Sequence, residues 1–465
     1  MASSDGVVGQ MRAVLGSAVC APPGSTAYEN ALAAVFFPEA ARRRPACVVA
    51  PRTVGDVATA MRVAAAAGAR VTVRGGGLSS NCVADGAVML DLSQHLDAAR
   101  PDADRVVVGG GATMGAMHRA LAPAGRAVPV GVVGHAGLGM ATRGGIGHLT
   151  RSLGLTVDHL VGVELVLPSG DIVHLSEQSS GDDAELWWAV RGCAPSVGVV
   201  TSAEFRTHEI GPVWVGRAVT GLDALATYFQ VAPELPRDIT MSAVLGHSSL
   251  SPDEPVLFLY AVCASRRDSA VGRARDGVDA VVAGSRAAPL YRSETSARYP
   301  AGLPEFAVPG AGAPEPAPGS GPRGSFFGKA AFTGPTLDDE VADALADRIR
   351  TAPTRACRID FQHTGGALAD VDDTATAFRG RTAEWSVPLN AIWDDGADDE
   401  VCRTWTRDTL RQLAAHTVGF YNVELRPGLP ETASETHAAY GDNLPRLHAL
   451  RHRHDPTGVL APLLP

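Results

Sequence analysis

Two glycine-rich stretches constrain the fold of this 465-residue chain more than any other feature. The first, residues 74–79, reads RGGGLS and follows an apolar segment, and the second, residues 131–147, reads GVVGHAGLGMATRGGIG. Glycine lets successive backbone amides turn toward one point, which forms a concave site for a phosphate. It also lets the main chain lie against a bulky ligand where a Cβ would clash. The two stretches together predict one long, phosphorylated ligand.

Neither stretch has the sequence of a common phosphate-binding loop. No Gly-Lys-Ser/Thr follows, as it does in a P-loop, and neither stretch has the strand, GxGxxG, helix order of a Rossmann unit. Residues 109–111 form a third glycine cluster. Any one of the three, taken alone, is typical of a tight turn. The prediction of a cofactor site therefore depends on their order and their neighbours.

Charge and cysteine content exclude several classes of protein. The formal net charge of −10 argues against nucleic-acid binding, which needs a basic face. Seven widely spaced cysteines without a CxxC pair favour reduced thiols over a disulfide framework or a zinc site. We expect no metal, and the sequence shows neither a signal peptide nor a membrane span. The expected protein is soluble and cytoplasmic, and its oligomeric state is left open.

The order of expected elements begins as an α/β protein. A strand at 46–50, an alanine-rich helix at 54–67 and a strand at 69–73 precede the first glycine stretch. Segments 160–167 and 172–175 predict a hairpin. From about residue 211 a second domain is expected, and residues 300–324 have no periodicity and predict a loop. The later strands are expected at 241–245, 256–263, 325–332, 358–363, 384–392 and 419–425, with helices at 222–229, 270–283, 338–350, 398–416 and 443–453.

The order of motifs resembles a known family, the flavin oxidoreductases with a PCMH-type FAD-binding domain, and within it the berberine-bridge-enzyme-like branch. Beyond the glycine stretches, the similarity covers HLTRSLGLTVDHLVGVELVLPSGDIV (148–173) and LWWAVRGCAPSVGVVTSAEF (186–205). It continues through HTGGALADV (363–371) and TAFRGR (376–381), and ends with FYNVEL and AYGDNLPRLHALRHRHDPTGVL. Five motifs in this order are specific.

The resemblance implies an α+β fold with three parts. Residues 1–210 would form a two-subdomain PCMH-type FAD-binding domain, whose core covers about 43–210. Residues 211–415 would form an α/β substrate-binding domain with an antiparallel sheet covered by helices. Residues 416–465 would return to the FAD domain.

The resemblance also implies FAD, with the pyrophosphate at the glycine stretches and the flavin between the two domains. Arg74 would neutralise the pyrophosphate, and clustered amides would bind it. The residues placed at the cofactor are Arg74, Gly75, Gly76, Gly77, Leu78, Ser79, Val132, Gly137, Gly139, Met140, Thr142, Gly144, Gly147, His148, Val199 and Asn422.

The chain departs from the family where many members attach FAD covalently. Leu78 stands at the position of the tethering histidine, and Val132 stands at that of the tethering cysteine. Neither side chain can form the bond, so the resemblance implies non-covalent FAD. Cys82, four residues past Leu78, is a weak candidate for a substitute anchor.

The chain also departs at the family's catalytic tyrosine, which is replaced by Phe420. Tyr421 is next to it, but strand alternation would point its side chain to the opposite face unless a bulge intervenes. Alternation likewise places either Asp360 or His363 toward the flavin, not both. The catalytic candidates are therefore Tyr421, His363 and Asp360, and a solvent-facing or capping role is the more common fate of such residues.

The leading functional hypothesis is an FAD-dependent oxidoreductase of a biosynthetic pathway that oxidises a small organic substrate and passes electrons to O2. The loss of both tethers and of the tyrosine also suits a redox-neutral cyclase or isomerase that keeps FAD for structure or electrostatics. A third hypothesis is a non-catalytic flavin-binding protein.

Overall fold

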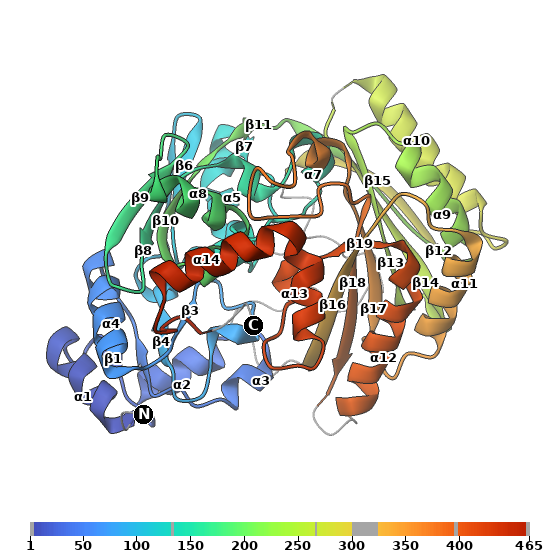
Figure 1. Ribbon diagram of the computed structural model, residues 1–465. Coiled ribbons are helices and arrows are strands. Elements are labelled where there is room, and N and C mark those ends of the chain that lie inside the picture. The colour runs from blue at the N-terminus through green and yellow to red at the C-terminus, as the bar shows by residue number, and fades with distance from the viewer. Residues whose placement is uncertain (1–3, 132–133, 266, 300–323, 395–398, 462–465) are drawn as a thin grey trace.

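The computed structural model describes residues 4–131, 134–265, 267–299, 324–394 and 399–461. Figure 1 shows an N-terminal half built on two sheets at the left, and a larger sheet with its helices at the right. The C-terminal helices α13 (Thr432–Tyr440) and α14 (Leu444–His454) cross between the two halves. The predicted loop at 300–324 falls almost wholly outside the described residues.

The first sheet places the first glycine stretch at a strand end. Its order is β1 (Cys20–Ala21), β2 (Cys47–Val49), β4 (Val88–Asp91) and β3 (Val71–Arg74), and β2, β4 and β3 run parallel. Helix α4 (Val54–Ala67) connects β2 to β3; Thr53 caps its start and the left-handed Gly68 (φ 61°) ends it, as predicted. The shorter helices α1 (Ser4–Leu15), α2 (Thr26–Ala33) and α3 (Pro38–Ala41) precede them.

The second sheet is antiparallel, and residues of the second glycine stretch belong to its apolar cluster. Its order is β5 (Ala99–Asp102), β6 (Arg105–Gly109), β10 (Val199–Arg206), β8 (Leu160–Val166) and β9 (Ile172–Ser176). The predicted hairpin is the pair β8–β9. Helices α5 (Met114–Leu121) and α8 (Asp182–Cys193) contact this sheet. The one-turn helix α6 (Leu138–Ala141) lies within the second glycine stretch, and α7 (Thr150–Leu153) contacts the third sheet. The short strands β7 (Arg126–Ala127) and β11 (His208–Glu209) pair beside it.

The third sheet has eight antiparallel strands. Their order is β15 (Tyr291–Arg298), β12 (Pro212–Gly221), β14 (Ser251–Cys263), β13 (Ile239–Ser248), β17 (Arg358–His363), β18 (Trp385–Trp393), β16 (Ser325–Thr333) and β19 (Thr417–Phe420). Helices α9 (Leu225–Val231), α10 (Asp268–Ala283), α11 (Asp339–Arg350) and α12 (Asp399–Gln412) cover one face (Figure 1). Large buried side chains such as Phe361, Trp385 and Leu389 form the core between this face and the helices.

The other face of the eight-stranded sheet packs against the N-terminal half. Phe332 of β16 shares an apolar cluster with Ile146 of the second glycine stretch. Two buried ion pairs join the halves: Arg151 Nη1 lies 2.7 Å from Glu384 Oε1, and Arg381 Nη1 lies 2.7 Å from Asp158 Oδ2. A ligand held by the glycine stretches would therefore face this side of the sheet.

The C-terminal segment differs from its prediction at the last strand. The expected strand 419–425 is wrong beyond Phe420, because the chain leaves the sheet and turns into a 3₁₀ helix at Asn422–Glu424. The register of β19 on β16 also shifts between Phe332 and Thr333, at a point of β19 that precedes Phe420. The rest of the segment packs on the N-terminal half, where Leu460 bridges to Val71. The domain boundaries stay predictions.

Candidate cofactor and substrate site

The first glycine stretch presents a row of backbone donors. It begins where β3 ends, at Arg74, so the amides of residues 75–79 are released from the sheet ladder. Among the residues that the structure describes, no acceptor faces these five N–H groups. Buried or half-buried amides need a partner, and clustered amides at a turn bind anions. The stretch therefore fits a phosphate group.

The two glycine stretches contact each other through their backbones. A Cβ on Gly76 would lie 2.3 Å from the carbonyl oxygen of His135, and a Cβ on Gly137 would lie 2.5 Å from the amide nitrogen of Gly76. Any side chain at either position would push the stretches apart. Gly139 differs, since it is exposed and nothing lies within 4 Å of its would-be Cβ. The prediction that both stretches serve one ligand is consistent with this contact.

The third glycine cluster has a structural explanation. A Cβ on Gly110 would lie 2.3 Å from the carbonyl oxygen of Val200, and a Cβ on Gly111 would lie 2.1 Å from that of Leu92. Their amides donate to Thr201 and Leu96 at 2.8 Å each. The glycines let neighbouring backbone segments approach closely. Both amides already donate hydrogen bonds within the protein, so they are not free to bind a phosphate.

Arg74 does not offer a free charge to the cofactor. Its Nη1 lies 2.8 Å from Asp91 Oδ2, with side-chain exposures of 8% and 1%, and its Nη2 donates to the carbonyl oxygen of Ala34 at 3.3 Å. Asp91 thus already balances the charge of Arg74, whose Nε has no partner. The role of Arg74 at a pyrophosphate stays a prediction.

Most of the remaining predicted cofactor residues contact other parts of the protein. Leu78 is half-buried and packs on the core of the second sheet, Met140 is half-buried, and Ser79 accepts from the amide of Asn81 at 3.2 Å. Thr142 donates to the carbonyl oxygen of Leu138 at 2.7 Å. Gly75, Gly77, Gly144 and Gly147 pack against other parts of the chain, and Val199 lies buried in β10. Val132 lies outside the described residues.

Cys82 cannot readily replace the missing tether. Burial raises the pKa of its thiol to about 12, so the thiolate that would form a covalent bond is scarce at neutral pH. All seven cysteines are buried and unpaired.

Tyr421 and Asn422 fix the second glycine stretch. The Tyr421 hydroxyl accepts from the amides of Gly145 at 3.0 Å and Ile146 at 3.4 Å, and burial raises the pKa of this phenol. Asn422 Nδ2 donates to the carbonyl oxygen of Gly192 at 3.0 Å. Because the strand has ended at Phe420, alternation no longer directs Tyr421, and its ring turns toward the glycine stretch. It thus lies at the candidate site, whereas its role as a base stays a prediction.

His363 and Asp360 lie on opposite faces of β17. His363 faces the helix-covered core, where it stacks on Trp385, with ring centroids 4.7 Å apart. The amide of Met241 donates to its Nδ1 at 3.1 Å, so Nε2 carries the hydrogen and donates to Glu384 Oε1 at 2.8 Å. Burial lowers the pKa of His363 to about 4. Both ring nitrogens are occupied, and we do not assign a proton-transfer role to this residue.

Asp360 faces the N-terminal half. Its Oδ2 accepts from Asn390 Nδ2 at 2.8 Å and lies 3.4 Å from Arg358 Nε, while its buried Oδ1 has no partner. Burial raises the pKa of this carboxyl group. A carboxyl group with one oxygen fixed and the other open, and with a raised pKa, is suited to accept a proton.

Two further polar atoms on this face lack partners. Gln362 is two residues from Asp360 on β17, and Ser386 is its cross-strand partner on β18. Gln362 Oε1 and Ser386 Oγ are buried without a hydrogen bond. Alternation placed Gln362 with Asp360 from sequence alone, but only the pairing of β17 with β18 brings Ser386 beside them.

Arg217 and Tyr260 were not predicted as site residues from the sequence. They are paired on β12 and β14, with the guanidinium 5.7 Å from the centre of the Tyr260 ring. His148 lies 4.8 Å from the same ring, and burial lowers the pKa of His148 to about 3. Tyr260 lies on the strand predicted at 256–263, and His148 was a predicted cofactor residue. No strand was predicted at β12, so Arg217 was not expected beside them.

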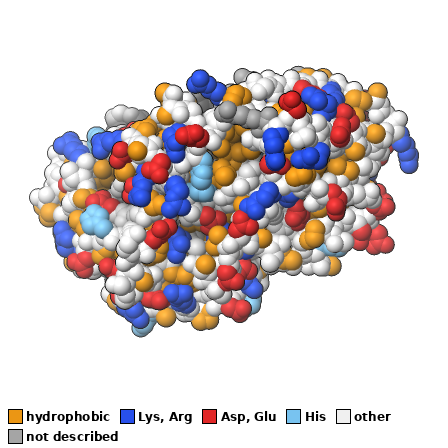
Figure 2. Space-filling view, turned by 90° about the horizontal axis from the view of Figure 1, so that it is seen from above, with side chains coloured by type: hydrophobic (Ala, Val, Ile, Leu, Met, Phe, Trp, Pro, Cys, Tyr) orange, Lys and Arg blue, Asp and Glu red, His pale blue; other side chains and the backbone are white. Residues whose placement is uncertain are grey.

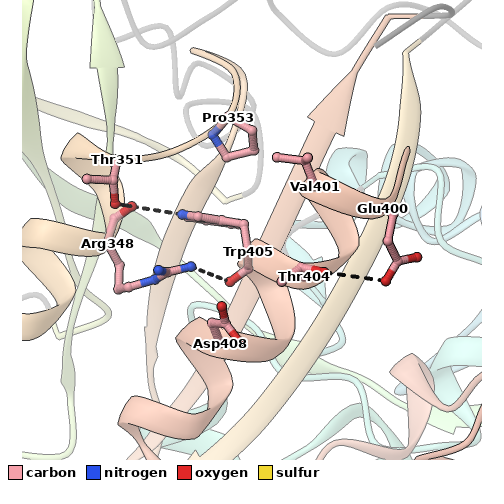
Figure 3. Close-up of a pocket in the computed structure, with 8 residues that line it drawn as sticks. All are labelled: Arg348, Thr351, Pro353, Glu400, Val401, Thr404, Trp405 and Asp408. Atoms are coloured by element: carbon pink, nitrogen blue, oxygen red, sulfur yellow. Dashed lines mark hydrogen bonds between the residues drawn. The ribbon is translucent and has the colours of Figure 1, made fainter. Parts of the chain in front are cut away.

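Seen from above, both signs of charge are scattered and hydrophobic side chains gather where the two halves meet (Figure 2). A hollow of about 420 Å³ lies at the other side of the sheet, between α11 and α12 (Figure 3). There Trp405 Nε1 donates to the carbonyl oxygen of Arg348 at 2.8 Å, so its polar groups bind each other. No helix in the described ranges has the length and apolarity to cross a bilayer.

Comparisons with known proteins agree with this geometry. A family model described as an FAD binding domain matches residues 45–176, which include the first glycine stretch and all of the second. The chain is 26% identical over 418 residues to an FAD-linked oxidoreductase of Dictyostelium discoideum, covering 89% of this chain and 86% of that protein. It is 37% identical over 175 residues to (R)-6-hydroxynicotine oxidase of Paenarthrobacter nicotinovorans, covering 36% of this chain and 37% of the relative.

Solved structures show the same fold. The BBE-like 1 protein of Physcomitrella patens aligns with a TM-score of 0.84 at 23% identity and covers 98% of both chains. A chitooligosaccharide oxidase aligns with a TM-score of 0.80 at 20% identity, covering 98% of this chain and 97% of the other. The chain is thus an FAD-dependent oxidoreductase with an FAD-binding domain at residues 45–176, and it has the fold of the BBE-like 1 protein.

Proposed function

We propose that this protein binds FAD without a covalent bond and uses it to oxidise a small organic substrate at the face of β17 and β18. The observation that carries the proposal is twofold: the amides of residues 75–79 have no acceptor among the described residues, and Asp360 Oδ1 on β17 is buried without a partner. The amides suit a phosphate, and the carboxyl oxygen suits a proton.

The residues present fit FAD. The backbone amides of residues 75–79, which have no acceptor among the residues that the structure describes, would bind the pyrophosphate, and the second glycine stretch supplies close-packed main chain beside it. Leu78 offers no nitrogen for a bond to the flavin ring, and the raised pKa of the Cys82 thiol disfavours a substitute. When bound, FAD supplies the two-electron acceptor.

Asp360 is the proton acceptor that we propose. Asn390 and Arg358 fix Oδ2, which leaves Oδ1 free to take a proton from the substrate as its carbon is oxidised. Tyr421 would hold the second glycine stretch in place through its two amide contacts. His363 would hold β17 to its neighbours rather than contact the substrate.

We propose O2 as the final electron acceptor, because several relatives are named oxidases. A biosynthetic role in the cytoplasm is consistent with seven unpaired cysteines. Related enzymes include a glucooligosaccharide oxidase with FAD linked through cysteine and histidine, so the form of attachment must be tested directly.

Acid precipitation of the purified protein tests the cofactor. We expect all yellow colour in the supernatant, whereas a yellow pellet would contradict the loss of both tethers. Under anaerobic conditions, substrate should bleach the flavin, and readmitted air should restore the colour and give peroxide. Turnover to a product of unchanged mass, without bleaching, would favour a redox-neutral cyclase or isomerase instead.

A further inference from the structure

Arg143 is the only residue of the second glycine stretch with a permanent charge. It is almost fully buried, with 7% of its surface exposed. Its Nε donates to the carbonyl oxygen of Gly139 at 2.8 Å, and its Nη1 donates to that of Asn422 at 3.1 Å. Among the residues that the structure describes, Arg143 forms no ion pair with a carboxylate. Because a buried cation is costly unless it is paired, this charge suits an anionic ligand.

The other strongly buried arginines of the described ranges show how this protein balances such charges. A carboxylate oxygen lies within 2.8 Å of three of them, which are Arg74, Arg151 and Arg381. Arg217 lies over the Tyr260 ring, with 5.7 Å between the guanidinium and the ring centre. Arg143 differs, since its hydrogen bonds to described residues go only to neutral backbone carbonyl groups.

The position of Arg143 connects it with the amides of residues 75–79. Gly139, whose carbonyl oxygen it binds, is two residues from Gly137, which corresponds to at most about 7 Å of chain. Gly137 contacts the first glycine stretch, because a Cβ on Gly137 would lie 2.5 Å from the Gly76 amide nitrogen. An anion bound by the amides can therefore also approach the guanidinium.

The third nitrogen of the guanidinium group is open to a ligand. Nη2 of Arg143 donates to no described residue, and it is not among the fully buried atoms without a partner, so it reaches accessible space. Guanidinium groups bind phosphate oxygens through charge-assisted hydrogen bonds. The group is thus both fixed by the protein and able to bind a phosphate.

We propose that Arg143 supplies the positive charge that balances the pyrophosphate of bound FAD. The flavin ring of oxidised FAD is neutral, so the negative charge of the cofactor lies on its two phosphates. The hydrogen bonds to Gly139 and Asn422 would hold the guanidinium in place as FAD binds. Arg74, whose charge Asp91 balances, would contribute less. This inference rests on the proposed non-covalent binding of FAD.

The first measurement is the rate at which the diluted holoenzyme releases FAD, followed by the fluorescence of free FAD. Arg143→Gln keeps a hydrogen-bond donor but removes the charge, so release should be about 10- to 100-fold faster. Arg143→Lys keeps the charge and should stay within about threefold of the natural protein. The control is Arg348→Gln, because Arg348 Nη2 also donates to a backbone carbonyl group, that of Trp405 at 2.9 Å, on the helix-covered side of the sheet (Figure 3). It should not change the rate.

Phosphorus NMR of the same holoenzymes gives a second readout that does not depend on release. The two pyrophosphate resonances should shift in Arg143→Gln. They should also shift in Arg143→Lys, because the ammonium group lies at a different distance from the phosphates, but not in Arg348→Gln. If Arg143→Gln does not fold, Arg143→Lys decides: retained FAD with shifted resonances supports the inference, and unchanged resonances contradict it.

Two results would overturn the inference. Natural release rates and natural resonances in both Arg143 variants would place the guanidinium away from the pyrophosphate. Equally fast release from Arg143→Gln and Arg143→Lys, with unchanged resonances, would leave Arg143 only the structural role of joining Gly139 to Asn422. FAD that acid does not release contradicts the proposed non-covalent binding alone, since the phosphorus resonances still test Arg143.

Discussion

Two residues of β17, three positions apart, have side chains in opposite environments. His363 of β17 faces the helices and has both ring nitrogens bonded, whereas Asp360 faces the N-terminal half with one oxygen open. The same difference separates the two faces of the sheet: large apolar side chains close one, and adjacent acceptors line part of the other. The helix-covered face stabilises the fold by close packing, whereas the other face has buried polar atoms that can bind a ligand.

The largest expected effect comes from the open carboxyl group. Asp360→Asn keeps the shape of the side chain but removes the proton acceptor, so kcat/KM should fall about 10²- to 10⁴-fold, with FAD affinity unchanged. In the natural protein, kcat/KM should also fall as the pH drops through the raised pKa of Asp360, because the base must be unprotonated. Steady-state rates across the pH range measure both, and full activity of the variant would exclude Asp360 as the base.

Removal of a large side chain from the helix-covered face should affect stability instead. Trp385 is fully buried in the core, so Trp385→Ala should lower the free energy of unfolding by about 3–5 kcal/mol. Urea unfolding measures this loss. A loss below about 1 kcal/mol would mean that this face is less tightly packed than the contacts imply.

His363 should make stability depend on pH. Its pKa is about 4 in the folded protein, against the ordinary 6.5, so the unfolded chain takes up the proton first as the pH falls. The stabilisation is complete above pH 6.5 and is lost toward pH 4, and it amounts to about 3 kcal/mol. Unfolding at pH 7 and pH 5 should therefore show a smaller pH effect for His363→Gln than for the natural protein. The comparison with the variant is needed because His148 and His159 also have lowered pKa values. Parallel pH profiles would contradict the assigned hydrogen bonds.

The smallest effect is expected at Ser386. Because its buried hydroxyl has no partner, Ser386→Ala should not lower the free energy of unfolding and should raise it by up to about 1–3 kcal/mol. Urea unfolding beside Thr333→Val checks this, since both variants remove an unpartnered hydroxyl. A loss above 1 kcal/mol for Ser386→Ala alone would reveal a structural partner for this hydroxyl and weaken the distinction between the faces.

The sequence by itself determined the features that depend on short stretches of chain. Thr53 and Gly68 bound α4 because capping and left-handed backbone are properties of a few neighbouring residues. The glycine stretches, the β8–β9 hairpin and the loss of a histidine at Leu78 are equally local. These features predicted a phosphorylated ligand, and the family resemblance implied FAD and the fold class.

Only the tertiary structure decided which side chains meet. Alternation left Asp360 and His363 as equal candidates, and the packing of helices on one face separated them. The sequence predicted Arg74 as a phosphate ligand, and only the fold showed that it forms an ion pair with Asp91. The Tyr421 ring points toward the second glycine stretch because β19 ends at Phe420, the residue before it. The reason is physical: local sequence sets backbone geometry and period, whereas partners come from pairing between strands that are distant in the chain.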